Sequence, residues 1–258
     1  MSETRATTRV LFLTRRYPPS RGGAQTHAFK LFTYLDQRAP TRLIALKAES
    51  ILHLAWFMPL TFVRAAVHLL LGRADIVYFA DGVVASLAWA LTPFKGRAKF
   101  CCSLFGLEMT FGNRWARDLM GAGVRRCDGI AMVSDNSLQI AAQTWDIDAE
   151  RMRLIYLGAE PEELPEDRDT VLRRAFEEKY GIDFDHDRVV LNLGRQVPRK
   201  GVAAFVEQGL ALLDPDIKIL IVGGGPDAER IAVGRDKLER PERVLLLGVL
   251  DDDVCSML

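Results

Sequence analysis

Short apolar runs alternate with amphipathic stretches along most of this chain. In the first half, the runs that predict β-strands cover residues 10–14, 42–46, 76–79, 99–104, 129–133 and 152–156. A helix is predicted over residues 24–35, after a loop of proline and glycine that follows the first run. Strands that alternate with helices in this way predict a parallel sheet covered by helices on both faces.

The alternation breaks near Gly158 and then resumes. Residues 160–167 are acidic and contain proline, which favours an interdomain linker. A helix predicted over 170–180 ends at Gly181, a favoured residue after a helix. We therefore divide the chain into a domain at 1–157, a linker with a connecting helix at 158–184, and a second domain at 185–258.

The second domain repeats the pattern with fewer elements. Strands are predicted over 189–193, 218–222 and 244–247, with helices over 202–213 and 227–237. A doubly wound nucleotide-binding domain generally has five or six strands. We therefore expect this domain to be incomplete, so that its remainder is supplied elsewhere or the sequence is a fragment.

Residues 51–71 are almost wholly apolar and approach the length that spans a bilayer. A spanning helix would separate the strands at 42–46 and 76–79, which belong to one sheet, so this interpretation is excluded. Two interpretations remain open. One is a buried helix or helical pair, and the other is a peripheral membrane contact with Trp56, Phe57 and Phe62 inserted.

Composition limits the classes of function. Lys and Arg together number 34, as do Asp and Glu, so no global basic excess points to nucleic acid. Any anion site must come from a local cluster. The four cysteines have neither C-x-x-C nor zinc spacing, and residues 1–9 are polar with no signal peptide. We expect a cytoplasmic protein with reduced thiols.

The first motif lies between the first strand and the first helix. Gly22 and Gly23 end the segment that begins Tyr17-Pro18-Pro19. Glycines let the backbone approach a ligand closely, and the N-terminus of the following helix favours an anion. A tight turn without a ligand fits the same residues, and the motif alone does not decide between the two.

The second motif carries the strongest chemical signal. Arg195, Arg199 and Lys200 follow a predicted strand, with Gly194 and Gly201 at either end of the segment. Guanidinium and ammonium groups neutralise a diphosphate, and a helix N-terminus adds to the effect. A solvated basic loop is the alternative. Ligands of open α/β sheets bind at the carboxyl ends of the strands, which favours the diphosphate.

The third motif is glycine-rich. Gly223, Gly225 and Ala228 match G-x-G-x-x-A after a strand. A dinucleotide site also needs an acidic residue at the end of the next strand. The first acid after that strand is Asp251, which comes too late, so a dinucleotide-dependent oxidoreductase is disfavoured.

Together these motifs resemble glycosyltransferase family 4. The order Pro18-Pro19-x-x-Gly22-Gly23, Gly194-Arg195, Arg199-Lys200-Gly201, Gly223-Gly224-Gly225-Pro226 and Leu247-Gly248 is similar to that family across nearly the whole chain. The resemblance implies the GT-B fold, in which two Rossmann-like domains face a cleft. Residues 1–157 would form the acceptor side, and residues 185–258 would bind the nucleotide sugar.

The resemblance also implies a reaction. A nucleoside-diphosphate sugar would donate its sugar, with retained configuration, to a glycan or lipid-linked acceptor. Arg195 and Lys200 would stabilise the leaving diphosphate electrostatically, with no metal or cofactor. The donor would also contact the residues Gly22, Gly23, Arg199, Gly224 and Gly225.

Two departures from the family pattern give an alternative. Phe105 and Gly106 stand where the family often has His-Gly, and phenylalanine cannot hydrogen-bond a sugar hydroxyl. Phe105, Gly106 and Glu108 are candidates for contact with acceptor or sugar, although Glu108 also fits an ordinary surface carboxylate. His27 is a candidate by location alone. The family's Glu-x7-Glu element is absent, so a non-catalytic nucleotide-sugar-binding or partner subunit is the second hypothesis.

Overall fold

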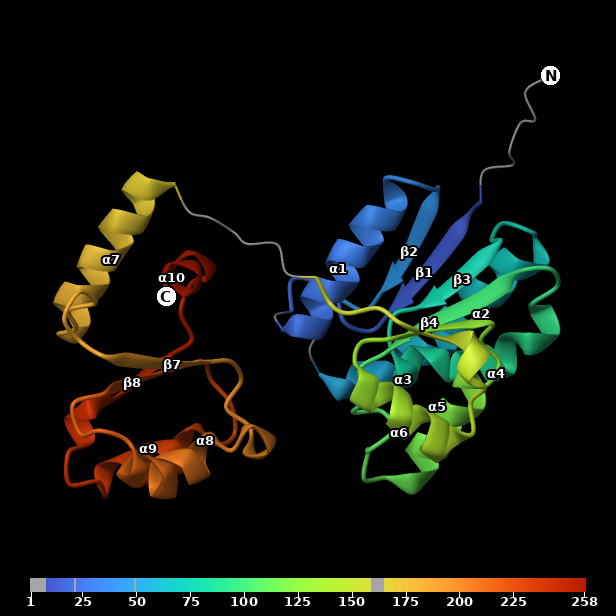
Figure 1. Cartoon of the computed structure of the whole chain (residues 1–258). Helices are drawn as coiled ribbons and strands as arrows, with labels where there is room; N and C mark the ends of the chain where they lie inside the picture. The colour runs from blue at the N-terminus through green and yellow to red at the C-terminus, as the bar shows by residue number, and fades with distance from the viewer. Residues whose placement is uncertain (1–7, 21, 49, 159–164) are drawn as a thin grey trace. The chain divides into compact units, whose positions relative to one another are not determined.

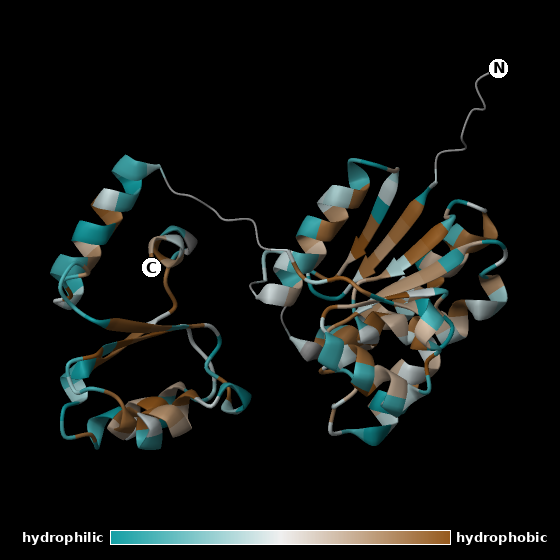
Figure 2. Cartoon of the chain, in the orientation of Figure 1, coloured by the Kyte–Doolittle hydropathy of each residue, from teal (hydrophilic) through white to brown (hydrophobic). Residues whose placement is uncertain are grey.

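The computed structural model describes residues 8–20, 22–48, 50–158 and 165–258 (Figure 1). The chain forms two compact units, Met1–Gly158 and Ala159–Leu258, each built around its own parallel sheet. Figure 2 shows that the strands of both sheets are mainly hydrophobic, while the exposed sides of many helices are polar. The predicted α/β class with two Rossmann-like parallel sheets is confirmed.

The first unit contains a six-stranded sheet in the order β2-β1-β3-β4-β5-β6. All neighbouring pairs are parallel. Its strands are β1 Val10–Thr14, β2 Thr41–Ala45, β3 Ile76–Phe79, β4 Lys99–Leu104, β5 Gly129–Met132 and β6 Met152–Leu154. Every residue of β1 is buried, as expected of a central parallel strand with helices on both faces.

Helices cover both faces of this sheet. They are α1 Gly23–Asp36, α2 Leu54–Leu70, α3 Gly82–Ala85, α4 Leu87–Leu91, α5 Arg114–Val124 and α6 Asp135–Trp145, with short 3₁₀ turns at Ile51–His53, Thr92–Phe94 and Ala149–Arg151. On one face Phe12 and Tyr78 pack with α1. On the other, Leu11, Val77 and Phe100 form the main core with the remaining helices.

Helix α2 settles how the apolar segment 51–71 packs. Phe57 is only 3% exposed and lies in the main core, and Phe62 packs edge-on against Phe94 at 6.0 Å between ring centroids. These two aromatic side chains therefore do not form the exposed face on which the membrane interpretation relied. Trp56 is 51% exposed. No helix among the described residues is both long and apolar enough to cross a membrane.

The second unit contains a three-stranded parallel sheet in the order β7-β8-β9. Its strands are β7 Val189–Leu193, β8 Lys218–Val222 and β9 Val244–Gly248. Its helices are α7 Glu166–Tyr180, α8 Val202–Ala204, α9 Ala228–Asp236 and α10 Asp252–Met257, with 3₁₀ turns at Pro198–Lys200, Leu210–Leu212 and Pro241–Arg243. α8 and α9 pack on one face of the sheet, and α7 and α10 on the other.

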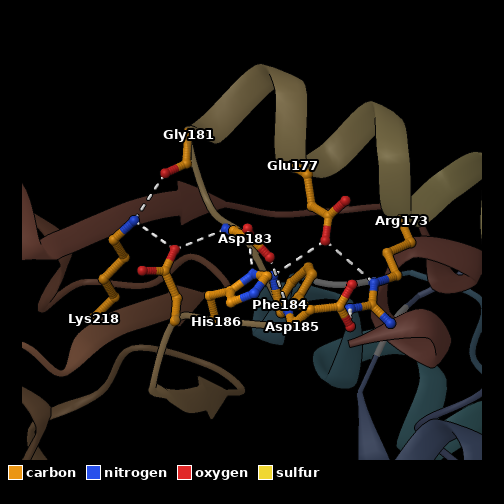
Figure 3. A network of polar contacts seen from close by, with 9 residues as sticks. Arg173, Glu177, Gly181, Asp183, Phe184, Asp185, His186 and Lys218 are labelled. Carbon is orange, nitrogen blue, oxygen red and sulfur yellow. Dashed lines mark hydrogen bonds and ion pairs between the residues drawn. The ribbon is translucent and has the colours of Figure 1, made fainter.

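Helix α7 belongs to the second unit. Phe176 is buried against Leu220 of β8. Polar contacts fix the end of the helix: the Arg173 guanidinium lies 2.6 Å from Asp185 in the segment before β7, and Lys218 Nζ of β8 donates to the Gly181 carbonyl at 2.8 Å and lies 2.6 Å from Asp187 (Figure 3). The helix begins at Glu166, inside the stretch predicted as linker, because acidic side chains in its first turn are favourable there. Residues 159–164 of that predicted linker lie outside the described residues.

The helix predicted over 202–213 is not regular. After the α-helical turn Val202–Ala204, the backbone widens into a π-helical stretch, Phe205–Gly209, and then tightens into a 3₁₀ turn. The Phe205 ring occupies the space beside Gly209, where a Cβ would lie 2.7 Å from it. Packing of Phe205 over a residue without a side chain accompanies the change in pitch.

Candidate functional site

The loop after β7 holds Arg195 at the carboxyl end of the sheet. Gly194 has φ 150°, and the next side chains are the exposed Arg195 and the buried Gln196. Gln196 Nε2 donates to the carbonyl of Gly194 at 2.8 Å and to that of Val222 at 3.1 Å. The Arg195 backbone is therefore held between two anchored residues.

The glycine-rich loop after β8 packs directly against this loop. The backbone N–H of Gln196 donates to the backbone carbonyl of Gly224 at 3.0 Å. The backbone N–H of Asp227 donates to the backbone carbonyl of Gln196 at 3.1 Å. A Cβ on Gly223 would lie 2.1 Å from the Gly194 carbonyl oxygen, and one on Gly225 would lie 2.1 Å from that of Gln196. The glycines therefore permit the approach of two backbones, and the second and third sequence motifs form one loop pair.

Three cations lie in the segment that follows β7. Arg195, Arg199 and Lys200 are exposed, and within the described parts of the chain none of them forms an ion pair. Other cations of the second unit do: Arg188 with Asp214, and Arg230 with Glu207. Side chains of this kind at the carboxyl end of a strand are suited to an anionic ligand.

The helix that follows contributes less than the sequence suggested. Pro198–Lys200 forms a 3₁₀ turn that ends at Gly201, with φ 72°, and only the single turn Val202–Ala204 is α-helical before the pitch changes. A short irregular helix has few aligned peptide dipoles. The positive character of this edge therefore comes mainly from the arginine and lysine side chains.

In the first unit, Gly22 and Gly23 begin α1. Gly22 has φ 142°, is the N-cap of the helix, and its carbonyl accepts from the amides of Gln25 and Thr26. The first turn has neither an acidic residue nor a side-chain cap. A Cβ on Gly23 would meet no atom within 4 Å, so this residue faces open space. Arg21 lies outside the described residues.

The structure corrects one interpretation of the loop after β4. Glu108 is 8% exposed and is not an ordinary surface carboxylate. Its carboxylate accepts from the amide of Phe105 at 3.2 Å and from that of Gly82 at 3.5 Å. Burial raises the pKa of Glu108, and the nearby Asp81 charge acts in the same direction. Glu108 therefore holds the Phe105–Gly106 turn in place and joins it to α3.

Two charged residues beside this turn were missed by the sequence reasoning. Asp81, which is 4% exposed, caps α3 by accepting from the amides of Val83 and Val84. Arg15 Nε, in the loop after β1, lies 3.1 Å from Asp81 Oδ1. The sequence carries a signal for the cap, because an aspartate follows an apolar strand and precedes Gly82. Nothing in it indicates the pairing with Arg15, 66 positions earlier.

His27, on α1, packs against the loop after β4. Its ring packs edge-on against Phe105, with 5.3 Å between ring centroids, so α1 adjoins the loop after β4. Burial lowers the pKa of His27. Its Nε2 atom is buried and has no hydrogen-bond partner among the described residues. The predicted residues Phe105, Gly106 and Glu108 thus lie together with His27 at one edge of the first sheet.

Other features lie elsewhere. A cavity of about 600 Å³ in the second unit lies beside α9, between Glu207 and Lys237, and contains none of the candidate cations. Across the described ranges, no cluster of three or more His, Cys, Asp or Glu side chains could hold a metal ion.

Comparison with known proteins identifies the family. The model of glycosyltransferase family 4 matches residues 8–163. No curated protein sequence matches the chain.

Similar solved structures include HepE of Anabaena in complex with UDP-glucose, at 17% identity and TM-score 0.68, covering 96% of this chain and 70% of that one. Sucrose-phosphate synthase of Thermosynechococcus elongatus is 16% identical at TM-score 0.70, and the match covers 97% of this chain and 72% of that one. The lipopolysaccharide outer core galactosyltransferase WaaB in its apo form is 15% identical at TM-score 0.64, and the match covers 95% of this chain and 69% of that one. The fold is thus that of GT-B glycosyltransferases, and because the family model covers more than half of the sequence, this chain belongs to glycosyltransferase family 4.

Proposed function

We propose that this protein transfers a sugar from a nucleoside-diphosphate sugar to a glycan or lipid-linked acceptor, with retention of the anomeric configuration. The observation that carries the proposal is the group of three exposed cations after β7, which form no ion pair with any residue that the structure describes. The family membership supports it, as does the likeness to a structure that contains UDP-glucose.

In this proposal, Arg195 and Lys200 bind the diphosphate and stabilise the negative charge that grows on it as the sugar leaves. A fixed cation stabilises a developing charge more than water does, because it needs no reorganisation. Arg199 assists at the rim of the site. This assigns charge neutralisation to side chains of the chain rather than to a metal ion.

The glycine positions have different roles in the same proposal. Gly224 and Gly225 present backbone to the nucleotide, while Gly22 and Gly23 offer the uncapped first turn of α1 to a phosphate. Phe105 and Gly106 contact the sugar or acceptor, and Glu108 positions that turn. We place the reaction on the cytoplasmic side of a membrane.

The test is a transfer assay on the wild-type chain with a panel of UDP-, GDP- and ADP-sugars and a lipid-extract acceptor. Arg195→Ala with Lys200→Ala should abolish turnover of the donor that the wild type uses. Arg174→Ala is the matched control, because this exposed arginine lies on α7. Unchanged turnover in the double variant would contradict the roles assigned to Arg195 and Lys200.

A nucleotide-sugar-binding subunit without transfer activity is the second candidate, favoured by Phe105. A half-buried phenylalanine offers no hydrogen bond to a sugar hydroxyl. If the wild type binds a nucleotide sugar in calorimetry but releases no nucleotide with any acceptor in the panel, this second candidate replaces the first.

A further inference from the structure

The outward face of α2 carries a continuous row of apolar side chains. Trp56, Leu60, Val63, Val67 and Leu70, here named the α2 stripe, are between 46% and 68% exposed. Their alternating spacing of four and three residues places them on one side of a helix. The opposite side of α2 lies in the main core of the first unit. The stripe is therefore a second apolar face that the fold of this unit leaves open.

Other apolar side chains at the ends of α2 and on a neighbouring helix are also exposed. Leu52 before α2 is 78% exposed, and Leu71 after it is 55% exposed. Trp89, on the adjacent α4, is 55% exposed. Single exposed apolar residues are common, but an extended row of them marks an interaction surface.

Within residues 50–74, which contain the stripe, the charged side chains are all basic, and Asp75 just after this segment is paired with Arg9. Residues 50–74 include Arg64 and Arg73 but no aspartate or glutamate. The pKa of His68, in the last turn of α2, is lowered first by burial and then by the charges of Arg42, Arg73 and Arg64, so these three arginines lie near that end of the helix. Within the part of the chain that the structure describes, none of the three forms an ion pair. An apolar row with a basic rim complements a surface that is apolar within and anionic outside.

We propose that the α2 stripe docks this protein onto an anionic phospholipid bilayer. The stripe enters the boundary between headgroups and acyl chains, while Arg64 and Arg73 meet lipid phosphates. Phe57 and Phe62 take no part, since both pack inward. The docking does not depend on the proposed transfer reaction.

A second copy of the chain fits this face less well. Helices that associate through a row of this spacing usually carry complementary charges along its flanks. Between residues 50 and 74 the only charged side chains are those of arginine, so two copies joined through this segment would oppose like charges. Pro59 also lies within α2, next to Leu60 of the stripe.

Vesicle sedimentation tests the proposal on the full chain. We expect the wild type to sediment with vesicles of phosphatidylcholine mixed with phosphatidylglycerol, and to bind pure phosphatidylcholine weakly. Trp56→Ser with Leu60→Ser and Val67→Ser should lower the partition by on the order of a hundredfold, because three apolar side chains no longer leave water. Arg64→Gln with Arg73→Gln should lower it on the order of tenfold on the anionic vesicles only.

The matched control removes the same number of exposed apolar side chains from the second unit: Val171→Ser, Leu212→Ser and Val233→Ser. This variant should sediment like the wild type. Circular dichroism confirms that each variant is folded, which is expected because every changed side chain is exposed. The proposal is overturned if the wild type ignores anionic vesicles or if the stripe and control variants sediment equally. It is also overturned if light scattering without lipid shows that the wild type and the control variant are dimers while the stripe variant is a monomer.

Discussion

Gly223→Ala should uncouple the two loops that form the candidate diphosphate site. Gly223 has φ 115°, a conformation that alanine rarely adopts, and a Cβ there would lie 2.1 Å from the Gly194 carbonyl oxygen. The position of a Cβ is fixed by its own backbone, and the atom it would meet is a backbone oxygen, so no side-chain rotation relieves the contact. The Gly194 segment must therefore move by about 1 Å, and Arg195 moves with it.

The magnitude follows from two costs. Overpacking a close contact costs about 1–3 kcal/mol, and a strained backbone conformation costs about 1–3 kcal/mol more. The second unit should therefore lose about 2–6 kcal/mol of its free energy of unfolding, which lowers the melting temperature of a domain this size by roughly 10 °C or more. Gly224→Ala should have a small effect, because its Cβ would meet only a Val249 methyl group at 3.3 Å.

The assay can separate the two units. All four tryptophans lie before residue 158, so tryptophan fluorescence reports the first unit alone. Hydrogen exchange in peptides of β7 and β8 reports the second. We expect Gly223→Ala to accelerate exchange there while the fluorescence melting curve stays unchanged. Equal exchange in Gly223→Ala and Gly224→Ala would refute the reasoning.

Three further predictions concern the first unit. Because burial raises the pKa of Glu108 above the ordinary 4.5, the stabilisation from its protonated form is present below pH 4.5 and is lost as pH rises through the raised pKa. Urea unfolding should therefore show that the free energy of unfolding of the wild type, relative to that of Glu108→Gln, falls as the pH rises from 4.5 through the raised pKa. A difference between the two proteins that does not change with pH would contradict this prediction. Phe105→Ala should raise the pKa of His27 towards its ordinary value, because it uncovers the ring, and NMR titration of the imidazole checks this. Asp81→Ala should cost about 1–3 kcal/mol by removing the α3 cap and the Arg15 pair; a fluorescence melting curve that does not move would count against it.

The sequence predicted the sheet well because of how parallel strands are buried. β1, β3 and β4 lie where the apolar runs placed them, since a strand covered on both faces must be apolar throughout. β2 begins one residue earlier than predicted. Its position depends on pairing with β1 rather than on its own composition.

Side-chain networks were harder to predict. The π-helical stretch at Phe205–Gly209 and the burial of Glu108 both depend on contacts that the fold creates. The pairing of Arg15 with Asp81 joins two loops that are distant in sequence. The candidate cations, by contrast, were visible as a local cluster. Their lack of ion-pair partners among the described residues is information that only the structure supplies.

The central claim is that Arg195 and Lys200 bind a diphosphate, and paired calorimetric titrations test it most directly. UDP and uridine are titrated into the wild type, the double variant Arg195→Ala with Lys200→Ala, and the control Arg174→Ala, with GDP and guanosine as the second pair. The ratio of nucleotide to nucleoside affinity isolates the diphosphate contribution. We predict that this ratio is high in the wild type and the control, and falls by about a hundredfold in the double variant, because each charged hydrogen bond contributes about 1.5–3 kcal/mol. An unchanged ratio in the double variant would contradict the account.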